Sequence, residues 1–148
     1  MELRSVRHDK ALRLAEQKIL CSRLARYVKE LYIYGSAARG AEKWNSDIDL
    51  LLVLDPEKKG NREIKREIIY LKGSITEEDI DAPEIDLKVV FGDDWKKSSQ
   101  TYYKNILQEG KQIWQRDHGE NFKPGSSADG YFYCKRTFVR EKRFYLSV

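Results

Sequence analysis

Residues 47–55 form the segment that most constrains the fold of this chain. They have the sequence Asp-Ile-Asp-Leu-Leu-Leu-Val-Leu-Asp, and the unbroken run of branched apolar residues predicts a buried strand. Pro56 follows and ends the strand, because proline cannot donate a hydrogen bond to a sheet ladder. This strand therefore belongs to the interior of a folded domain.

The remaining pattern predicts helices that alternate with strands. Apolar residues at spacings of three and four, from Leu12 to Val28, indicate an amphipathic helix within the first thirty residues. Further helices are predicted over residues 61–72, with Asn61 as N-cap, and over residues 99–109, with Gly110 as C-terminal cap. Strands are predicted over residues 31–34, 84–91 and 112–114. The order predicts an α/β (α+β) domain with a small mixed sheet flanked by helices.

Length and composition indicate one globular domain followed by a tail. A chain of 148 residues with 41% apolar and 35% charged residues is expected to hold one domain, which we place at residues 1–118. Residues 119–130 contain Gly, Ser and Pro at the density of a linker, and residues 131–148 form a basic aromatic arm. Two cysteines are too few for a disulfide framework.

The net charge of +4 is concentrated in the tail. From Gly119 onward, six Lys and Arg face three Asp and Glu, which leaves +1 for residues 1–118. A nearly neutral body disfavours nucleic acid as a partner. The interleaved rings and cations of residues 131–148 would suit RNA, but we favour an arm that covers a sheet edge or joins two chains as a homodimer.

The sequence offers no segment for a membrane. No apolar run reaches the roughly 18 residues that a spanning helix needs. The N-terminus, MELRSVRHDK, has charges where a signal peptide has its apolar region. These features predict a cytoplasmic protein without a membrane partner.

Three aspartates stand where folding alone does not favour them. Asp47 and Asp49 are two residues apart in the buried strand, so both carboxylates should point to one face, about 7 Å apart. Their charges repel, and a divalent cation is the simplest compensation. Asp86 lies in the predicted strand 84–91, and strand pairing would bring it against the first two. Three carboxylates from two strands suit two Mg²⁺ ions, although surface acids at a solvated strand end are the plain alternative.

A second motif, Gly35-Ser36-Ala37-Ala38-Arg39-Gly40, follows the strand over residues 31–34. A glycine at a strand-to-helix turn lets the backbone approach a ligand closely. The N–H groups at the start of the helix, together with the Ser36 hydroxyl, would form an anion site. Such a loop can hold the β- and γ-phosphates of a nucleotide while metal ions act on the α-phosphate, so the two motifs are complementary parts of one reaction.

Two basic residues near these motifs each have two interpretations. Arg39 either contacts phosphate or pairs with Glu42 on the helix surface. Lys88, two residues from Asp86 on the same face of its strand, either contacts phosphate or neutralises the acids.

The remaining residues with reactive or aromatic side chains have simpler expectations. His8 and His118 have no sequence partners that suggest catalysis or metal binding, so we expect them to be exposed. Trp95, Tyr102 and the other aromatic residues of the body are predicted to pack in the core or at a sheet edge.

The chain resembles the minimal nucleotidyltransferase (MNT) family of the DNA polymerase β superfamily in the combination of these motifs. The matching residues are Gly35-Ser36, Ala38-Arg39-Gly40, Ser46-Asp47-Ile48-Asp49-Leu50 and the later Asp86. The resemblance extends from about Leu20 to Trp114. Gly-Ser or Asp-x-Asp alone would be weak evidence, whereas their combination at this spacing is specific.

The resemblance implies a polymerase β-like fold and Mg²⁺-dependent transfer of a nucleoside monophosphate, favouring AMP from ATP, with release of pyrophosphate. By position, Asp47 and Asp49 would bind metal, and Asp86 would complete the site and assist deprotonation of the acceptor. Gly35 and Ser36 would grip the triphosphate. Members of this family often act beside a HEPN-type toxin ribonuclease, so the expected acceptor is a protein of that kind. The alternative is an antitoxin-type module that neutralises a partner by occlusion; transfer to RNA or a small molecule is less favoured.

Overall fold

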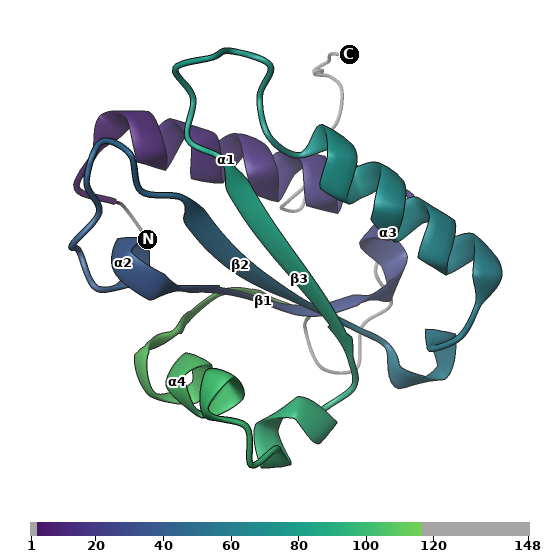
Figure 1. Cartoon of the computed structure of the whole chain (residues 1–148). Coiled ribbons are helices and arrows are strands. Elements are labelled where there is room, and N and C mark those ends of the chain that lie inside the picture. The colour runs from purple at the N-terminus through teal and green to yellow at the C-terminus, as the bar shows by residue number, and fades with distance from the viewer. Residues whose placement is uncertain (1–2, 117–148) are drawn as a thin grey trace.

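A four-stranded mixed sheet forms the centre of the computed structural model, which describes residues 3–116 (Figure 1). Its strands are β1 (Val28–Tyr34), β2 (Ile48–Leu54), β3 (Ile85–Phe91) and β4 (Lys111–Gln115). The α-helices of this part of the chain are α1 (Val6–Leu20), α2 (Gly35–Ala38), α3 (Arg62–Ser74) and α4 (Thr101–Glu109). The predicted class, a small mixed sheet flanked by helices, is confirmed.

The strand order is β3-β2-β1-β4. Strand β1 runs antiparallel to both β2 and β4, whereas β2 and β3 are parallel. Helix α3 lies between β2 and β3 in the chain and provides the crossover that a parallel pair requires. The N-terminal ends of β2 and β3 therefore lie side by side at the same end of the sheet.

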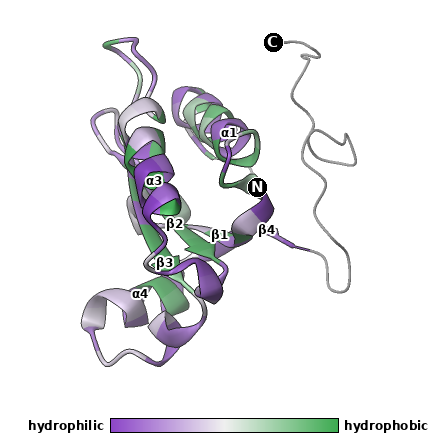
Figure 2. Ribbon diagram, turned by 90° about the vertical axis from the view of Figure 1, so that its right-hand side faces the viewer, coloured by the Kyte–Doolittle hydropathy of each residue, from purple (hydrophilic) through white to green (hydrophobic). Residues whose placement is uncertain are grey.

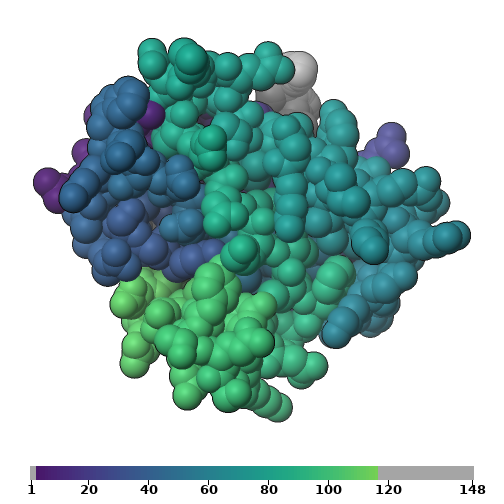
Figure 3. Space-filling view, viewed as in Figure 1, coloured from purple at the N-terminus to yellow at the C-terminus, as the bar shows by residue number. Residues whose placement is uncertain are grey.

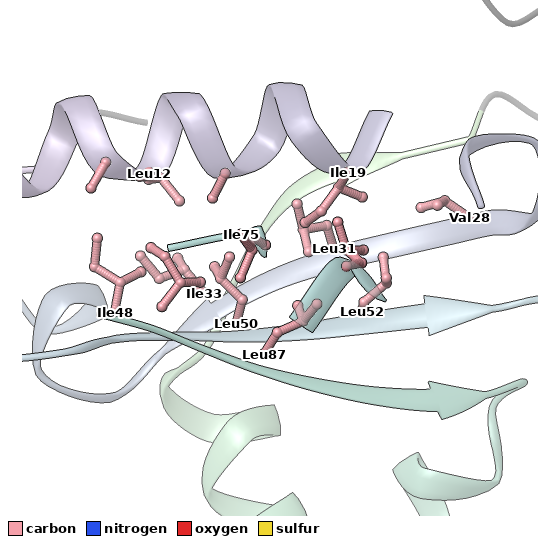
Figure 4. Packing of buried hydrophobic residues seen from close by; sticks show 14 of the residues in the cluster. Leu12, Ile19, Val28, Leu31, Ile33, Ile48, Leu50, Leu52, Ile75 and Leu87 are labelled. Atoms are coloured by element: carbon pink, nitrogen blue, oxygen red, sulfur yellow. The ribbon is translucent and has the colours of Figure 1, made fainter. Parts of the chain in front are cut away.

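One face of the sheet packs against α1 and α3. Successive side chains of a strand point to opposite faces, so Leu50, Leu52 and Leu54 of β2 share this side. Leu12 and Ile19 project from α1 onto them (Figure 4). Because these side chains are almost fully buried, this cluster is the main hydrophobic core of the described residues.

The opposite face of β2 packs against α4 and a short 3₁₀ turn at Asp94–Lys97. Leu51 and Val53 contact Trp95 of this turn and Ile106 of α4. Figure 2 shows α4 on the other side of the sheet from α1 and α3. By strand alternation Asp49 faces the same side as Leu51, and α4 therefore lies over the face that carries the candidate acids.

Two helix ends follow the capping residues predicted from the sequence. The Asn61 side chain accepts a hydrogen bond from the backbone N–H of Ile64 at 3.0 Å and so caps α3. Gly110 ends α4, but its φ of −70° is an ordinary one. Glycine is required there for space, because a Cβ at this position would lie 2.5 Å from the carbonyl oxygen of Ile106.

The first predicted helix is too long. We expected helical spacing to continue to Val28, but α1 ends at Leu20 and β1 begins at Val28. The Ser22 hydroxyl donates to the carbonyl of Ile19 at 2.7 Å and accepts from the N–H of Leu24 at 3.2 Å, which stabilises a turn instead of another helical turn. Leu24 and Val28 are still fully buried. Their apolar character therefore indicates burial in the core and not a continuation of the helix.

The structure does not bear on every expectation. No helix among residues 3–116 is long and apolar enough to span a membrane. The linker at residues 119–130 and the arm at residues 131–148 lie outside the described residues, as does His118.

Ile106→Ala should destabilise the protein by about 2–5 kcal/mol, because it removes a buried side chain that packs on β2 and leaves a cavity. Denaturant unfolding followed by circular dichroism measures this change. Leu107→Ala is the matched control, since Leu107 is the next residue of α4 and is 46% exposed. Equal losses of unfolding free energy in the two variants would show that α4 is not held on the sheet by this contact.

Candidate active site

The structure brings two of the three predicted acids together. Asp49 of β2 and Asp86 of β3 are direct partners in the parallel register. Tyr34, at the end of β1, is the antiparallel partner of Asp49 on its other side. One row across the sheet therefore holds Tyr34, Asp49 and Asp86.

Asp47 lies just outside the strand in which we expected it. Strand β2 begins at Ile48, so Asp47 belongs to the end of the preceding loop and its side chain is exposed. The expectation that Asp47 lies in the strand with Asp49 is therefore wrong by one residue, and strand alternation does not set the direction of its side chain. Asp47 still lies close enough for its charge to act on Asp49.

Asp49 carries an unfavourable negative charge. Partial burial raises the pKa of the Asp49 carboxyl, and the charges of Asp86 and Asp47 raise it further. The positive charges of Lys88 and Arg39 oppose this shift of the Asp49 pKa but do not cancel it. The site therefore has an excess of negative charge that a bound cation would relieve.

Gly35 leaves the Asp49 carboxylate uncovered. Its φ is +77°, a left-handed backbone conformation that residues other than glycine rarely adopt. A Cβ at this position would lie only 2.3 Å from Oδ2 of Asp49. Glycine is thus required both by the turn out of β1 and by the carboxylate beside it.

The predicted strand-to-helix turn is present, but its helix is short. Helix α2 has four residues, and its backbone hydrogen bonds include Arg39 N–H to Gly35 O at 3.2 Å. Within the described residues the half-buried Ser36 hydroxyl makes no hydrogen bond. A helix of one turn has a small dipole, so an anion here would depend mainly on backbone N–H groups and this hydroxyl.

Two tyrosines lie next to the acids. The hydroxyls of Tyr34 and Tyr102 are hydrogen-bonded, and their rings meet edge to face with centroids 5.7 Å apart. Burial raises the pKa of the Tyr34 hydroxyl, and the hydrogen bond with Tyr102 raises it further. Both hydroxyls are therefore neutral at physiological pH, and the one that accepts in this bond keeps its own proton to donate beside the carboxylates.

Lys88 lies near Asp49 and Tyr102, a position that is compatible with both of its interpretations. Its Nζ is 5.6 Å from the centroid of the Tyr102 ring, a cation–π distance. Its charge lowers the pKa of Asp49, as expected of a residue that neutralises the acids.

Arg39 does not pair with Glu42. Its Nη1 lies 2.9 Å from Oε1 of Glu109 at the end of α4, 70 residues away in the chain. Glu42 instead accepts a hydrogen bond from the Ser5 N–H at 3.0 Å. The Arg39–Glu109 pair is exposed enough to contribute little to stability, so Arg39 can exchange this carboxylate for another anion.

A pocket of about 180 Å³ lies between α2 and α4. Figure 3 shows the two segments, blue and light green, meeting on this face of the molecule. The lining residues are Tyr34, Gly35, Arg39, Tyr102, Asn105 and Glu109. The pocket thus joins the glycine turn to a face of α4.

Sequence reasoning missed the contribution of α4 to this site. We expected Tyr102 only to pack, and Asn105 and Glu109 were not considered. The one usable signal was the position of Tyr102 and Asn105 three residues apart, which places them on the same face of the predicted helix.

The donor chemistry of the site fits a hard divalent cation. The available ligands are carboxylate oxygens, and the raised pKa of Asp49 reflects the charge that such a cation would balance. Among residues 3–116, however, no three His, Cys, Asp or Glu side chains are grouped closely enough to hold an ion as they stand. Asp47 would have to turn toward the Asp49–Asp86 pair for all three to act together.

His8 is not the exposed residue that we expected. It is fully buried, with an exposed fraction of 0%. The sequence offers no signal for this, because its partners are Ser5 and the carbonyl of Ser46, 38 residues away.

The chain is similar to several solved structures. A proposed nucleotidyltransferase from Sulfolobus solfataricus is 22% identical, with a TM-score of 0.49 over 79% of this chain and 89% of that chain. A toxin–antitoxin structure with AMP-PNP is 21% identical, with a TM-score of 0.42 over 74% of this chain and 73% of that chain. A mutant of the toxin–antitoxin MntA-HpeT is 19% identical, with a TM-score of 0.41 and the same coverage of 74% and 73%.

The family assignment rests on the sequence. A search of curated proteins gives no significant match. Residues 17–119 match the family model described as polymerase beta, nucleotidyltransferase. This match spans more than half of the 148 residues and includes the glycine turn, Asp47, Asp49 and Asp86, so the chain belongs to the polymerase β nucleotidyltransferase family.

Proposed function

We propose that this protein transfers AMP from ATP to a hydroxyl group of a protein acceptor, with Mg²⁺ as cofactor. The observation that carries the proposal is the pairing of Asp49 with Asp86 directly beside Gly35, where no side chain could be accommodated. Carboxylates and an open backbone turn are the two parts that a metal-bound triphosphate needs.

The three acids would hold the cation. Asp47, Asp49 and Asp86 offer carboxylate oxygens, and Asp49 gains most because its ionised form is disfavoured in the empty site. When bound, Mg²⁺ supplies polarisation of the phosphoryl group that is transferred.

The triphosphate would lie along the glycine turn. Backbone N–H groups after Gly35 and the Ser36 hydroxyl would hold its β- and γ-phosphates. Arg39 would leave Glu109 for a phosphate, and Lys88 would stay near the acids and balance their charge. The pocket beside the turn, lined by Tyr102 and Asn105, provides room for the rest of the nucleotide.

Asp86 would then accept the proton of the acceptor hydroxyl. The acceptor oxygen forms a bond to the α-phosphorus while the bond from that phosphorus to the bridging oxygen breaks. The proton moves to the Asp86 carboxylate, and pyrophosphate leaves. Asp86 suits this role because its side chain is exposed to an incoming acceptor, whereas Asp49 is half-buried.

A protein such as a HEPN-type toxin is the acceptor that we propose. The resemblance to the MNT family supports it, and the near-neutral charge of residues 1–118 disfavours nucleic acid. An antitoxin that only occludes its partner is the competing proposal, and transfer assays with variants of the acids separate the two.

Gly35→Ala should abolish the rise in melting temperature that Mg²⁺ and ATP cause in the wild type, because the new methyl group displaces the Asp49 carboxylate. Differential scanning fluorimetry with and without Mg²⁺ and ATP measures the effect. The Asp47→Asn/Asp49→Asn double variant should lose the same response.

Gly60→Ala is the matched control for Gly35→Ala. Gly60 has a similar φ of +84°, but a Cβ there meets nothing within 4 Å. Both variants should lose roughly 1–3 kcal/mol from backbone strain. Only Gly35→Ala should lose the ligand response, and a full response in that variant would contradict the site.

Asp49→Asn should remove a pH-dependent loss of stability. The folded-state pKa of Asp49 is raised above its ordinary value of 3.8, so the folded protein binds this proton more tightly than the unfolded chain. Stability from this group is therefore present at low pH and is lost as pH rises from the ordinary value through the raised one. Above that range the ligand-free variant should be at least as stable as the wild type in urea unfolding.

Asp55→Asn is the control at the other end of β2. Asp55 pairs with Arg116 at 3.1 Å, so its replacement should lower stability at pH 7. If Asp49→Asn destabilised the protein as Asp55→Asn does, Asp49 would be a structural residue.

Asp86→Asn should reduce transfer of labelled AMP to the acceptor by about a hundredfold or more, since it removes both a metal ligand and the proposed base. Binding of the acceptor, measured by isothermal titration calorimetry, should stay near the wild-type value. If acceptor binding is lost while transfer is unchanged, the assignment of Asp86 is wrong. If the wild type binds and inhibits the acceptor without transferring AMP, the occluding antitoxin is the correct function.

A further inference from the structure

His8 is the only buried polar or charged residue among residues 3–116. Its Nδ1 lies 2.9 Å from the Ser5 hydroxyl, and its Nε2 lies 2.8 Å from the carbonyl oxygen of Ser46. A carbonyl oxygen can only accept, so Nε2 carries the proton and donates to Ser46. A buried imidazole is costly without partners, and here both ring nitrogens have one.

The hydrogen bond to Ser46 orients the peptide group directly before Asp47. The peptide group directly after Asp47 is oriented as well, because the Ile48 N–H donates to the Glu84 carbonyl at 2.9 Å. Asp47 itself is exposed and precedes β2, so the sheet ladder does not hold it. The two flanking hydrogen bonds therefore determine the direction in which the Asp47 side chain leaves the backbone.

Neighbours of His8 hold the rest of the same loop. Arg4 donates to the carbonyl of Gly40 at 2.7 Å, and Arg7 donates to that of Trp44 at 2.7 Å. Figure 1 shows this loop, between α2 and β2, beside the N-terminal end of α1. The two arginine contacts are exposed, so water can replace them. Water cannot replace the buried contact of His8 in the same way.

We propose that His8 is a positioning residue that holds the backbone at Asp47, so that a rotation of the Asp47 side chain alone brings its carboxylate to Asp49 and Asp86 at a divalent cation. The importance of this backbone position for catalysis rests on the proposed function. Partners of this kind, which hold a ligand residue without touching the ion, typically change metal affinity or activity by about 10–100-fold when they are removed.

A pair of variants separates the two hydrogen bonds of His8. The amide of Gln in His8→Gln reaches the position of Nε2 and can still donate to the Ser46 carbonyl. The shorter amide of Asn in His8→Asn reaches only the position of Nδ1, near Ser5, and loses the contact with Ser46. Ile19→Val, a fully buried position at the other end of α1, is the control for a general loss of packing.

The first measurement is amide hydrogen exchange by NMR in the ligand-free full chain. The reporters are the N–H groups of Ser46 and Ile48, which donate to the carbonyls of Lys43 and Glu84 at 3.0 Å and 2.9 Å. His8→Asn should speed their exchange by about tenfold or more, while the Asp55 N–H, bonded to Tyr27 at the far end of β2, should not change. In His8→Gln and Ile19→Val, the exchange rates at all three positions should match those of the wild type after correction for any change in the free energy of global unfolding.

The second measurement is the Mg²⁺ concentration that gives half-maximal AMP transfer. It should rise about 10–100-fold in His8→Asn and return toward the wild-type value in His8→Gln. Unchanged exchange at Ser46 and Ile48 in His8→Asn would overturn the proposal, and so would failure of both His8 variants to fold. If the wild type shows no transfer, the proposed function fails, while the exchange comparison still decides whether His8 holds the backbone at Asp47.

Discussion

Burial of β2 on both faces is the constraint on which the rest of the structure depends. Helices α1 and α3 cover one side of this strand, and α4 with Trp95 covers the other. A strand enclosed in this way tolerates charge only at its ends, where Asp49 and Asp55 are partly exposed. Asp49 and Asp55 lie at the two ends of β2, and their negative charges have different surroundings. Asp55 has the guanidinium of Arg116, whereas Asp49 faces another carboxylate.

This difference distinguishes Asp55, which has a structural ion pair, from Asp49, which we propose to be functional. An ion pair such as Asp55–Arg116 fastens the end of β4 to the sheet. The Asp49–Asp86 pair has the opposite character, since each charge makes the other less favourable. Stability that is lost in the empty site can be recovered when a cation and a nucleotide bind. The chain belongs to the polymerase β nucleotidyltransferase family. Under the proposed function, the cation of nucleotidyl transfer would bind at this pair.

Two segments far apart in the chain complete the site around these strand ends. Helix α4 contributes Tyr102 and Glu109, which reach Tyr34 and Arg39 across the face of the sheet. The N-terminal turn of α1 holds the loop before β2 through His8. Both helices also pack in the core, so the same contacts that stabilise the fold bring polar side chains to the site.

The sequence by itself determined the strands, the caps and the motifs, because these depend on local rules. The apolar run of β2, the Asn61 cap and the glycine turn each involve residues a few positions apart. The tertiary structure alone decided that Arg39 pairs with Glu109 and not with the nearby Glu42, and that His8 is buried. It also ended α1 at Leu20, where a serine turn replaced the expected helical turns. These outcomes depend on which segments meet in space, and the packing of α1 and α4 on opposite faces of the sheet is not encoded in the spacing of neighbouring residues.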